Sequence, residues 1–141
     1  MRTLALDVGD ERIGVAISDA GGHLARPLEV IARRAGPSSF VRISEITVAH
    51  GVEQIIIGLP LLADGSEGKQ AQSCRAYAAG LQNHVRVPIV WYDERGTTRR
   101  ATEILAENNA SRRRRRQASD QVAAAVILQH YLDEHSGGPE T

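Results

Sequence analysis

The stretch LALDVGDERIGVAISD, residues 4–19, decides how this chain begins its fold. Short runs rich in β-branched residues, 3–8 and 12–18, lie on either side of a turn sequence, a pattern typical of a β-hairpin. Asp7 interrupts the first of these apolar runs. A carboxylate that is removed from water is costly unless it is paired or binds a metal ion. The sequence therefore predicts a partner that offsets the charge of Asp7.

Three further segments are expected to be strands. Residues 27–31 begin at a proline and continue the antiparallel meander. The runs EQIIIGLP (53–60) and VPIVWYDE (87–94) are apolar without interruption, which is typical of strands buried on both faces.

Helical patterns separate the later strands. The first is expected to have a cap at Ser38 or Ser39 and to end at Gly51. Its apolar residues recur about once per helical turn: Phe40, Ile43, Ile46 and Val48. The other expected helices cover residues 69–85, 95–109 and 118–135, and a loop holding Arg112–Arg116 precedes the last.

This order of elements predicts an α/β fold. Strand-helix-strand crossovers require parallel pairing with a right-handed connection. We expect one domain, residues 1–135, with a five-stranded mixed sheet, an antiparallel meander followed by parallel strands, and helices on both faces. The polar end, 136–141, is expected to be disordered. Ligands of such sheets bind at the carboxyl ends of the parallel strands.

Composition narrows the class of protein. The 141 residues, 42% hydrophobic and 24% charged, fit one globular domain with zero net charge. No apolar stretch approaches the roughly 20 residues that span a bilayer, and Asp7 breaks any signal-peptide pattern. The single cysteine, Cys74, excludes an internal disulfide and a cysteine-based zinc site. These features favour a cytoplasmic protein.

Acidic residues are expected to meet at one edge of the sheet. Asp7 lies near the end of the first strand, and Asp93 and Glu94 end the last. Asp120 shares a stripe of the last helix with apolar residues four, seven and eleven positions further on, so it is expected to face the sheet. Strand alternation alone does not decide between Asp93 and Glu94.

Close carboxylates repel one another unless a cation neutralises them. The site offers only oxygen ligands, which favours Mg²⁺ or Mn²⁺ over zinc. Two such ions about 4 Å apart can activate water and stabilise the leaving oxygen of a phosphodiester. Structural explanations stay open: Asp120 could begin a helix, and Asp93 or Glu94 could pair with a nearby arginine.

Four motifs, in this order, resemble the bacterial YqgF/RuvX family. They are LDVGDERIGVAISD (6–19), GLPLLADGSEG (58–68), DERGTT (93–98) and D-x-x-AA-x-x-ILQ-x-YL (120–132). The resemblance extends over nearly the whole chain. It implies a ribonuclease-H-like fold, similar to Holliday-junction resolvases, and a nuclease that matures the 5′ end of pre-16S rRNA.

The resemblance also implies site residues. It places an acid triad, both catalytic and metal-binding, on Asp7, Glu94 and Asp120, and so chooses Glu94 over Asp93. Gly96 departs from the family pattern, which has a bulky apolar residue there. The residues expected to contact nucleic acid are Arg12, Arg95, Thr97, Thr98, Arg112, Arg113, Arg114, Arg115 and Arg116.

Some of these features have a second interpretation. Arg12 could pair with Asp10 or Glu11 in the hairpin turn instead of binding phosphate, and the arginine run could be a solvated charge cluster. The loop 64–68 could contact substrate through its amides, or form a plain turn with Ser66 as a helix cap.

The expected function is a metal-dependent nuclease that acts on structured RNA, with DNA as a further substrate class. The expected oligomeric state is a monomer or a weak homodimer, with no membrane partner. Two alternatives remain: a resolvase of branched DNA, which requires paired active sites, and a non-catalytic rRNA-binding assembly factor.

Overall fold

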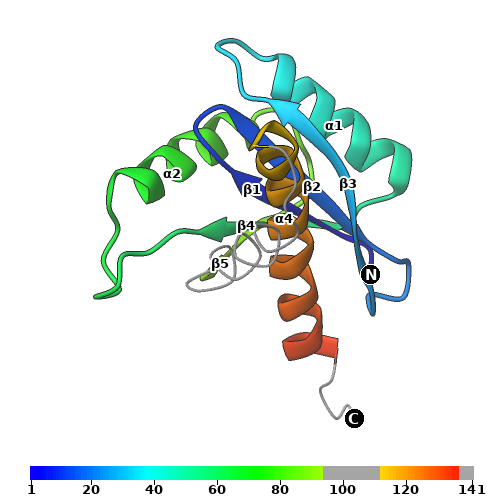
Figure 1. The fold of residues 1–141 in the computed structure, drawn as a ribbon. Coiled ribbons are helices and arrows are strands. Elements are labelled where there is room, and N and C mark those ends of the chain that lie inside the picture. The colour runs from blue at the N-terminus through cyan, green and yellow to red at the C-terminus, as the bar shows by residue number, and fades with distance from the viewer. Residues whose placement is uncertain (94–111, 137–141) are drawn as a thin grey trace.

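The computed structural model describes residues 1–93 and 112–136, with only the backbone of 112–121 and 136 (Figure 1). In chain order the elements are β1 (Thr3–Val8), β2 (Arg12–Ser18), β3 (Ala25–Ala32), α1 (Ser38–His50), β4 (Gln54–Leu59), α2 (Lys69–Leu81), β5 (Ile89–Asp93) and α4 (Arg112–Ser136).

The five strands form one mixed sheet in the order β3-β2-β1-β4-β5. β1 lies at the centre, antiparallel to β2 and parallel to β4. β3 continues the antiparallel meander, and β5 pairs with β4 in parallel. The predicted hairpin, the mixed five-stranded sheet and the parallel crossovers are therefore confirmed.

The outer strands differ from their predicted form. β3 is longer than the expected 27–31, and its register shifts opposite Val15 and Ala16, so that Pro27 lies inside an edge strand. Proline is tolerated there because an edge strand does not need every N–H group for pairing. β5 is half-exposed over Ile89–Tyr92 and lies at the other edge of the sheet, so the prediction of burial on both faces was wrong.

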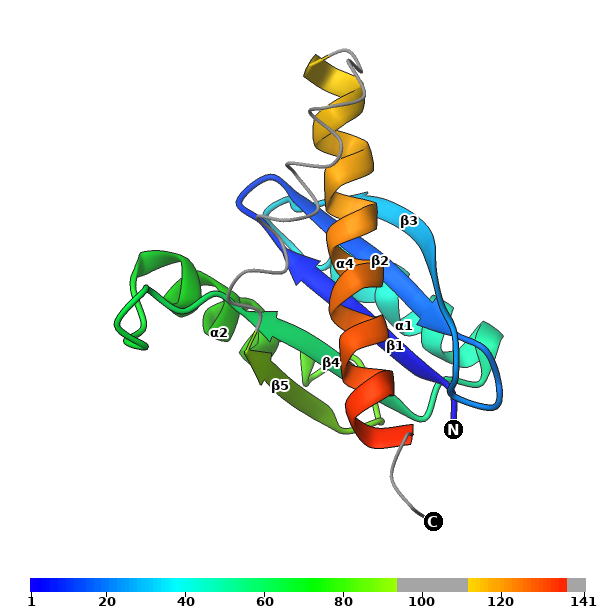
Figure 2. The same cartoon turned by 60° about the horizontal axis from the view of Figure 1, so that its bottom comes forward.

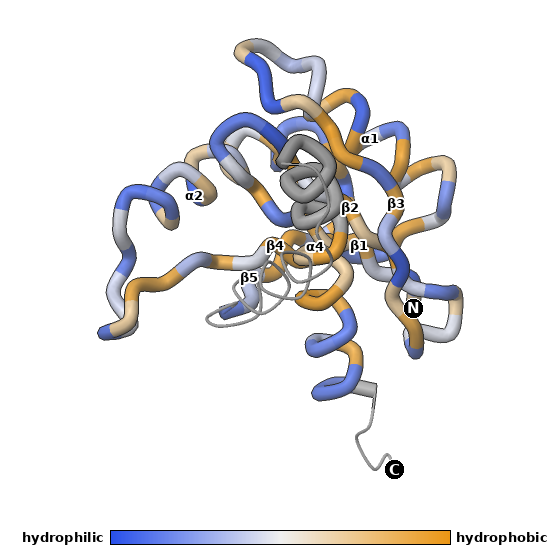
Figure 3. Tube along the Cα trace, in the orientation of Figure 1, coloured by the Kyte–Doolittle hydropathy of each residue, from blue (hydrophilic) through white to orange (hydrophobic). Residues whose placement is uncertain are grey.

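Two cores lie on the two faces of the sheet. Leu4, Leu6, Ile55 and Ile57 belong to the core shared with α1 and α2, while Ala5, Ala16 and Ile56 belong to the core beneath α4. Figure 2 shows α4 crossing the sheet, and Figure 3 shows hydrophobic residues where its middle crosses the strands. Each fully buried isoleucine stabilises the fold by about 2 kcal/mol.

The predicted C-terminal end of α1 is confirmed, but the predicted cap at its start is not. Gly51 ends the helix in the left-handed conformation, with φ of 63°, which glycine adopts without strain. Residue Pro37 precedes the helix, and no side-chain hydrogen bond caps its start. Ser39 is buried and its Oγ accepts a hydrogen bond of 2.7 Å from the Tyr77 hydroxyl. The serine cap was therefore a wrong prediction.

The core-facing stripe of α1 is also shifted. Ile43 and Ile46 are buried as expected, but Val48 is 80% exposed and Thr47 is buried in its place. The Thr47 hydroxyl donates to the Ser44 carbonyl oxygen, which allows this polar side chain to lie inside.

α4 is longer than predicted, because it begins at Arg112 and not at residue 118. The arginines 112–116 therefore lie in a helix, and the predicted loop was wrong. The expected helix 95–109 and the end 137–141 lie outside the described residues. No helix in the described part of the chain is long and apolar enough to span a membrane.

The contact between Ser39 and Tyr77 generates a stability prediction. Ser39→Ala leaves the Tyr77 hydroxyl buried without this partner, so the free energy of unfolding should fall by about 1–3 kcal/mol. Tyr77→Phe in the Ser39→Ala background removes the unsatisfied hydroxyl and should recover part of that loss. Urea unfolding of the two single variants and the double variant measures the coupling. Additive losses would contradict the pairing.

Candidate active site at the carboxyl edge of the sheet

Asp7 lies at the carboxyl end of the central strand. It is the last but one residue of β1 and is half-buried. Leu6 and Val8 belong to the core beneath α1 and α2, whereas Ala5 belongs to the core beneath α4. Because side chains alternate between the two faces of a strand, Asp7 shares the α4 face with Ala5.

Glycines flank Asp7 on both neighbouring strands. Gly14 of β2 pairs with Asp7. The register that pairs Leu6 with Ile57 of β4, continued by one residue, brings Gly58 level with Asp7 on the other side. Neither glycine has a side chain, so no side chain rises from the neighbouring strands directly beside the carboxylate.

The turn after Asp7 is tight. The Gly9 N–H donates to the Arg12 carbonyl oxygen at 2.9 Å, and a Cβ at Gly9 would lie only 2.9 Å from that oxygen. Glycine is therefore required for the turn. Arg12 forms an ion pair with Glu11 at 3.6 Å, which is the structural alternative expected for this arginine.

α4 runs from the carboxyl edge of the sheet toward the opposite edge. Near its end, the Tyr131 hydroxyl accepts a hydrogen bond of 2.9 Å from Gln54, the first residue of β4. Further back, Ala124 packs beside Ala5 in the same core. Residues earlier than Ala124 therefore lie progressively nearer the end of β1 that carries Asp7.

The backbone of Asp120 lies one turn before Ala124 on this path. Ala124, Ile127 and Tyr131 do face the sheet, as the predicted stripe requires. Asp120 follows the start of the helix by eight residues, which is more than two turns. It is therefore not a helix cap, and that structural explanation of its charge was wrong.

The end of β5 fixes the direction of Asp93. Tyr92 packs against the core beneath α4 and Trp91 against the other core. Alternation therefore directs Asp93, the last residue of β5, to the face opposite that of Asp7. Glu94, Arg95, Thr97 and Thr98 lie outside the described residues.

The loop after β4 is a closed turn. Asp64 Oδ1 accepts hydrogen bonds from the backbone and hydroxyl of Ser66, which lower the pKa of the Asp64 carboxyl below its usual value. The turn is the plainer of the two interpretations of this loop. Ser66 does not cap α2, because the residue before that helix is Gly68 and no side-chain bond is made there.

Glu67 at the end of this loop is held by an arginine. Both carboxylate oxygens accept hydrogen bonds from Arg75, at 2.7 and 2.6 Å, and this contact lowers the pKa of Glu67. The guanidinium of Arg75 also lies 4.9 Å from the ring centroid of Trp91. Glu67 is thus part of an ion pair that joins the loop to α2.

The described residues contain no group of three metal-binding side chains. Two of the three acids of the expected triad, Glu94 and Asp120, have side chains outside that part of the structure. Asp7 itself fits a hard cation, because it offers carboxylate oxygens at a half-buried position near the end of β1. The backbone of Arg112–Arg116 forms the first turns of α4.

Comparison with solved structures confirms the ribonuclease-H-like fold class. The chain is similar to Thermus thermophilus RuvC in complex with a Holliday junction substrate, with a TM-score of 0.59 and 16% identity over 97% of this chain and 96% of that one. It is also similar to the Fowlpox virus resolvase in a Holliday junction complex, with a TM-score of 0.56 and 10% identity over 95% and 98% of the two chains.

Comparison of sequences identifies the family. A protein of Pelotomaculum thermopropionicum named "Putative pre-16S rRNA nuclease" is 43% identical over 99% of both chains. A Moorella thermoacetica protein of the same name is 47% identical over 94% of this chain and 95% of its own length. Residues 1–134 match the model of a family described as RuvX, Holliday junction resolvase. The chain therefore belongs to the RuvX family.

Proposed function

We propose that this protein is a metal-dependent nuclease that cleaves phosphodiester bonds in structured RNA, with pre-16S rRNA as the substrate. The observation that carries the proposal is Asp7, a half-buried acid at the carboxyl end of a central strand with glycines beside it. The names of the relatives, which share more than two fifths of their residues with this chain, support the choice of substrate.

The proposed catalytic residues are Asp7, Glu94 and Asp120. The phase of β5 argues against Asp93: Tyr92 packs against the core beneath α4, so alternation directs Asp93 to the face opposite that of Asp7. The backbone of Asp120 lies inside α4, one turn before Ala124, which packs against the sheet.

These acids would hold Mg²⁺ or Mn²⁺, because their carboxylate oxygens are hard ligands. Bound there as a pair, such ions would supply an activated water and stabilise the leaving oxygen of the phosphodiester. Asp7, at the centre of the sheet, would hold both ions, with Glu94 and Asp120 completing the ligand sets.

The first turns of α4 are proposed to bind the nucleic acid backbone. Five consecutive arginines, Arg112–Arg116, lie where the helix dipole is already positive, and the first turn holds no acid. Cations are unfavourable at that end of a helix unless anions neutralise them. In Figure 2 this end of α4 projects past the sheet. Arg12, Arg95, Thr97 and Thr98 are proposed as further contacts.

The proposed setting is the bacterial cytoplasm, where rRNA precursors are processed, and the proposed oligomeric state is a monomer or a weak homodimer.

A second candidate function is the resolution of four-way DNA junctions, which the description of the family model favours. A resolvase cuts two strands symmetrically and so requires a dimer. Cleavage of a synthetic junction by a dimeric form, with pre-rRNA left intact, would select that function.

A non-catalytic role in ribosome assembly is tested through Asp7. We expect Asp7→Asn to lower the cleavage rate of a pre-16S rRNA fragment by about three orders of magnitude, because several kcal/mol of transition-state stabilisation are lost. Asp133→Asn, near the other end of α4, is the matched control and should cleave as wild type. Normal rRNA maturation in cells that hold only the Asp7→Asn protein would instead support the assembly role.

The choice between the two neighbouring acids gives a second test. Glu94→Gln should abolish cleavage to the same extent as Asp7→Asn, whereas Asp93→Asn should retain most of the wild-type rate because its strand position faces away from Asp7. Rates are measured on the same RNA fragment at saturating Mn²⁺. A dead Asp93→Asn variant beside an active Glu94→Gln variant would reverse the assignment.

Metal binding can be measured without activity. Saturating Mn²⁺ should raise the melting temperature of the wild-type protein by about 5 °C or more, since a ligand that binds only the folded state stabilises it. Asp7→Asn should lose most of this shift, and in EDTA it should melt no lower than wild type because the acids repel one another less. An unchanged Mn²⁺ shift in the variant would show that Asp7 does not hold the metal.

A further inference from the structure

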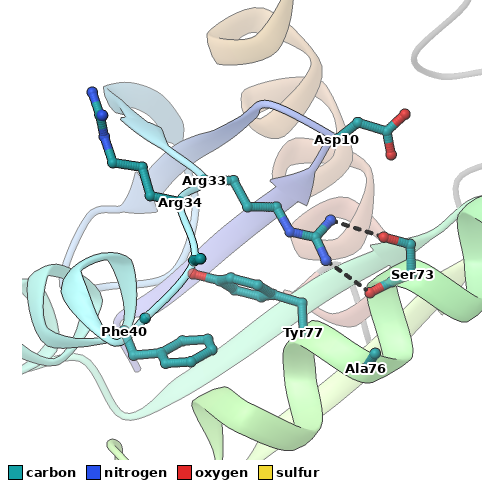
Figure 4. Close-up of a pocket in the computed structure, with 9 residues that line it drawn as sticks. Asp10, Arg33, Arg34, Phe40, Ser73, Ala76 and Tyr77 are labelled. Atoms are coloured by element: carbon teal, nitrogen blue, oxygen red, sulfur yellow. Dashed lines mark hydrogen bonds between the residues drawn. The ribbon is translucent and has the colours of Figure 1, made fainter.

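A polar pocket lies beside the turn that follows β1, on the face of the sheet opposite α4 (Figure 4). It has a volume of about 510 Å³ and opens between the end of β3 and α2. The described residues that give it its chemical character are Asp10, Arg33, Arg34, Ser73, Ala76 and Tyr77. Two arginines and one acid leave this set with an excess of positive charge.

Arg33 is fixed in place by uncharged groups. Its Nη1 donates to the carbonyl oxygen of Gly9 at 3.0 Å and to Ser73 Oγ at 2.9 Å. Its Nη2 donates to the Ser73 carbonyl oxygen at 3.3 Å, and the guanidinium lies 5.1 Å from the ring centroid of Tyr77. A guanidinium has five N–H groups, so two remain for a ligand, and the positive charge is oriented in advance.

The pocket and Asp7 lie on the two sides of one turn. Gly9 follows Asp7 by two residues, which span about 7 Å when extended. The Arg33 N–H also donates to the Glu11 carbonyl oxygen at 2.8 Å, so the end of β3 is attached to this turn at two points. A nucleic acid strand bound at Asp7 that crosses the turn therefore arrives at Arg33.

Arg33 also has a structural role, because it links the end of β3, the hairpin turn and α2. That role does not account for the open space beside it or for Arg34, an exposed arginine that extends from the same rim. A rigid guanidinium with free donors in an open polar pocket is the arrangement that binds phosphate oxygens.

We propose that this pocket binds a backbone phosphate of the nucleic acid strand that flanks the scissile bond. The inference rests on the proposed nuclease function and extends its substrate path over the hairpin turn to the second face of the sheet. The contact is independent of base sequence, because it involves only the charge and oxygens of the backbone.

The test places an acid inside the pocket. Ala76 lies on the exposed side of α2 within the pocket, and Ala79 lies on the same helix, exposed and outside the described lining. Ala76→Glu offers Arg33 a carboxylate that competes with phosphate, while Ala79→Glu makes the same change in net charge nearby. Glutamate is a good helix former, so both variants should fold.

Binding of a short fluorescent RNA to the full-length protein is measured in EDTA, over a range of salt. Ala76→Glu should weaken binding about tenfold. It should also reduce the slope of log affinity against log salt concentration by about 1, as expected for one lost phosphate contact. Ala79→Glu should bind nearly as wild type. Arg34→Ala, which adds no new charge partner, should weaken binding in the same direction.

Equal binding by wild type, Ala76→Glu and Arg34→Ala would overturn the inference, even where wild type binds and cleaves RNA. A wild-type protein that neither binds nor cleaves RNA would instead sink the proposed function. Calorimetry with inorganic phosphate shows whether the pocket binds a phosphate of the nucleic acid backbone or free phosphate. Phosphate binding that is lost in Ala76→Glu while RNA affinity stays unchanged would identify a free phosphate site and contradict the strand path.

Discussion

The fold depends on how a charged side chain is accommodated in the central strand of a sheet that helices cover on both faces. Asp7 is the only acid of β1, and both neighbours along the strand belong to the core beneath α1 and α2. Its own face is the one that α4 covers. Completing the apolar layer at this point would bury the charge. The strand positions beside Asp7 are instead Gly14 and Gly58, which add no side chains to this layer.

Alanines make the other half of this arrangement. Ala5 and Ala16 on the sheet, with Ala123 and Ala124 on α4, are fully buried, so the helix backbone lies close to the strands along its middle. A closely packed helix has a fixed rotational phase, because each side chain meets a fixed partner. That phase extends one turn back to the backbone of Asp120. Packing in the apolar part of the interface thereby fixes the path of the helix backbone toward the end of β1.

Local patterns in the sequence predicted the helices and strands, but they did not predict contacts between residues that are far apart in the chain. Continuous apolar runs identified β4, and the glycine at position 51 ended α1, because both signals are local. Ser39 gave the signal of a helix cap, but its partner is Tyr77, which lies 38 residues away. A run of five arginines resembles a loop by composition alone, yet arginine is a good helix former and continues α4.

The site shows the same division between local and distant information. Sequence alone placed Asp7 and the stripe of α4, since strand and helix periods are regular. Arg33 gave no signal, because its partners Gly9 and Ser73 lie 24 and 40 residues away. Contacts of this kind form between distant parts of the chain, so a shared fold does not fix them. A fold shared with junction resolvases at 16% identity or less therefore does not by itself decide the substrate: in the proposed function the acids would carry out the reaction, and the surfaces on either side of the hairpin turn would bind the strand.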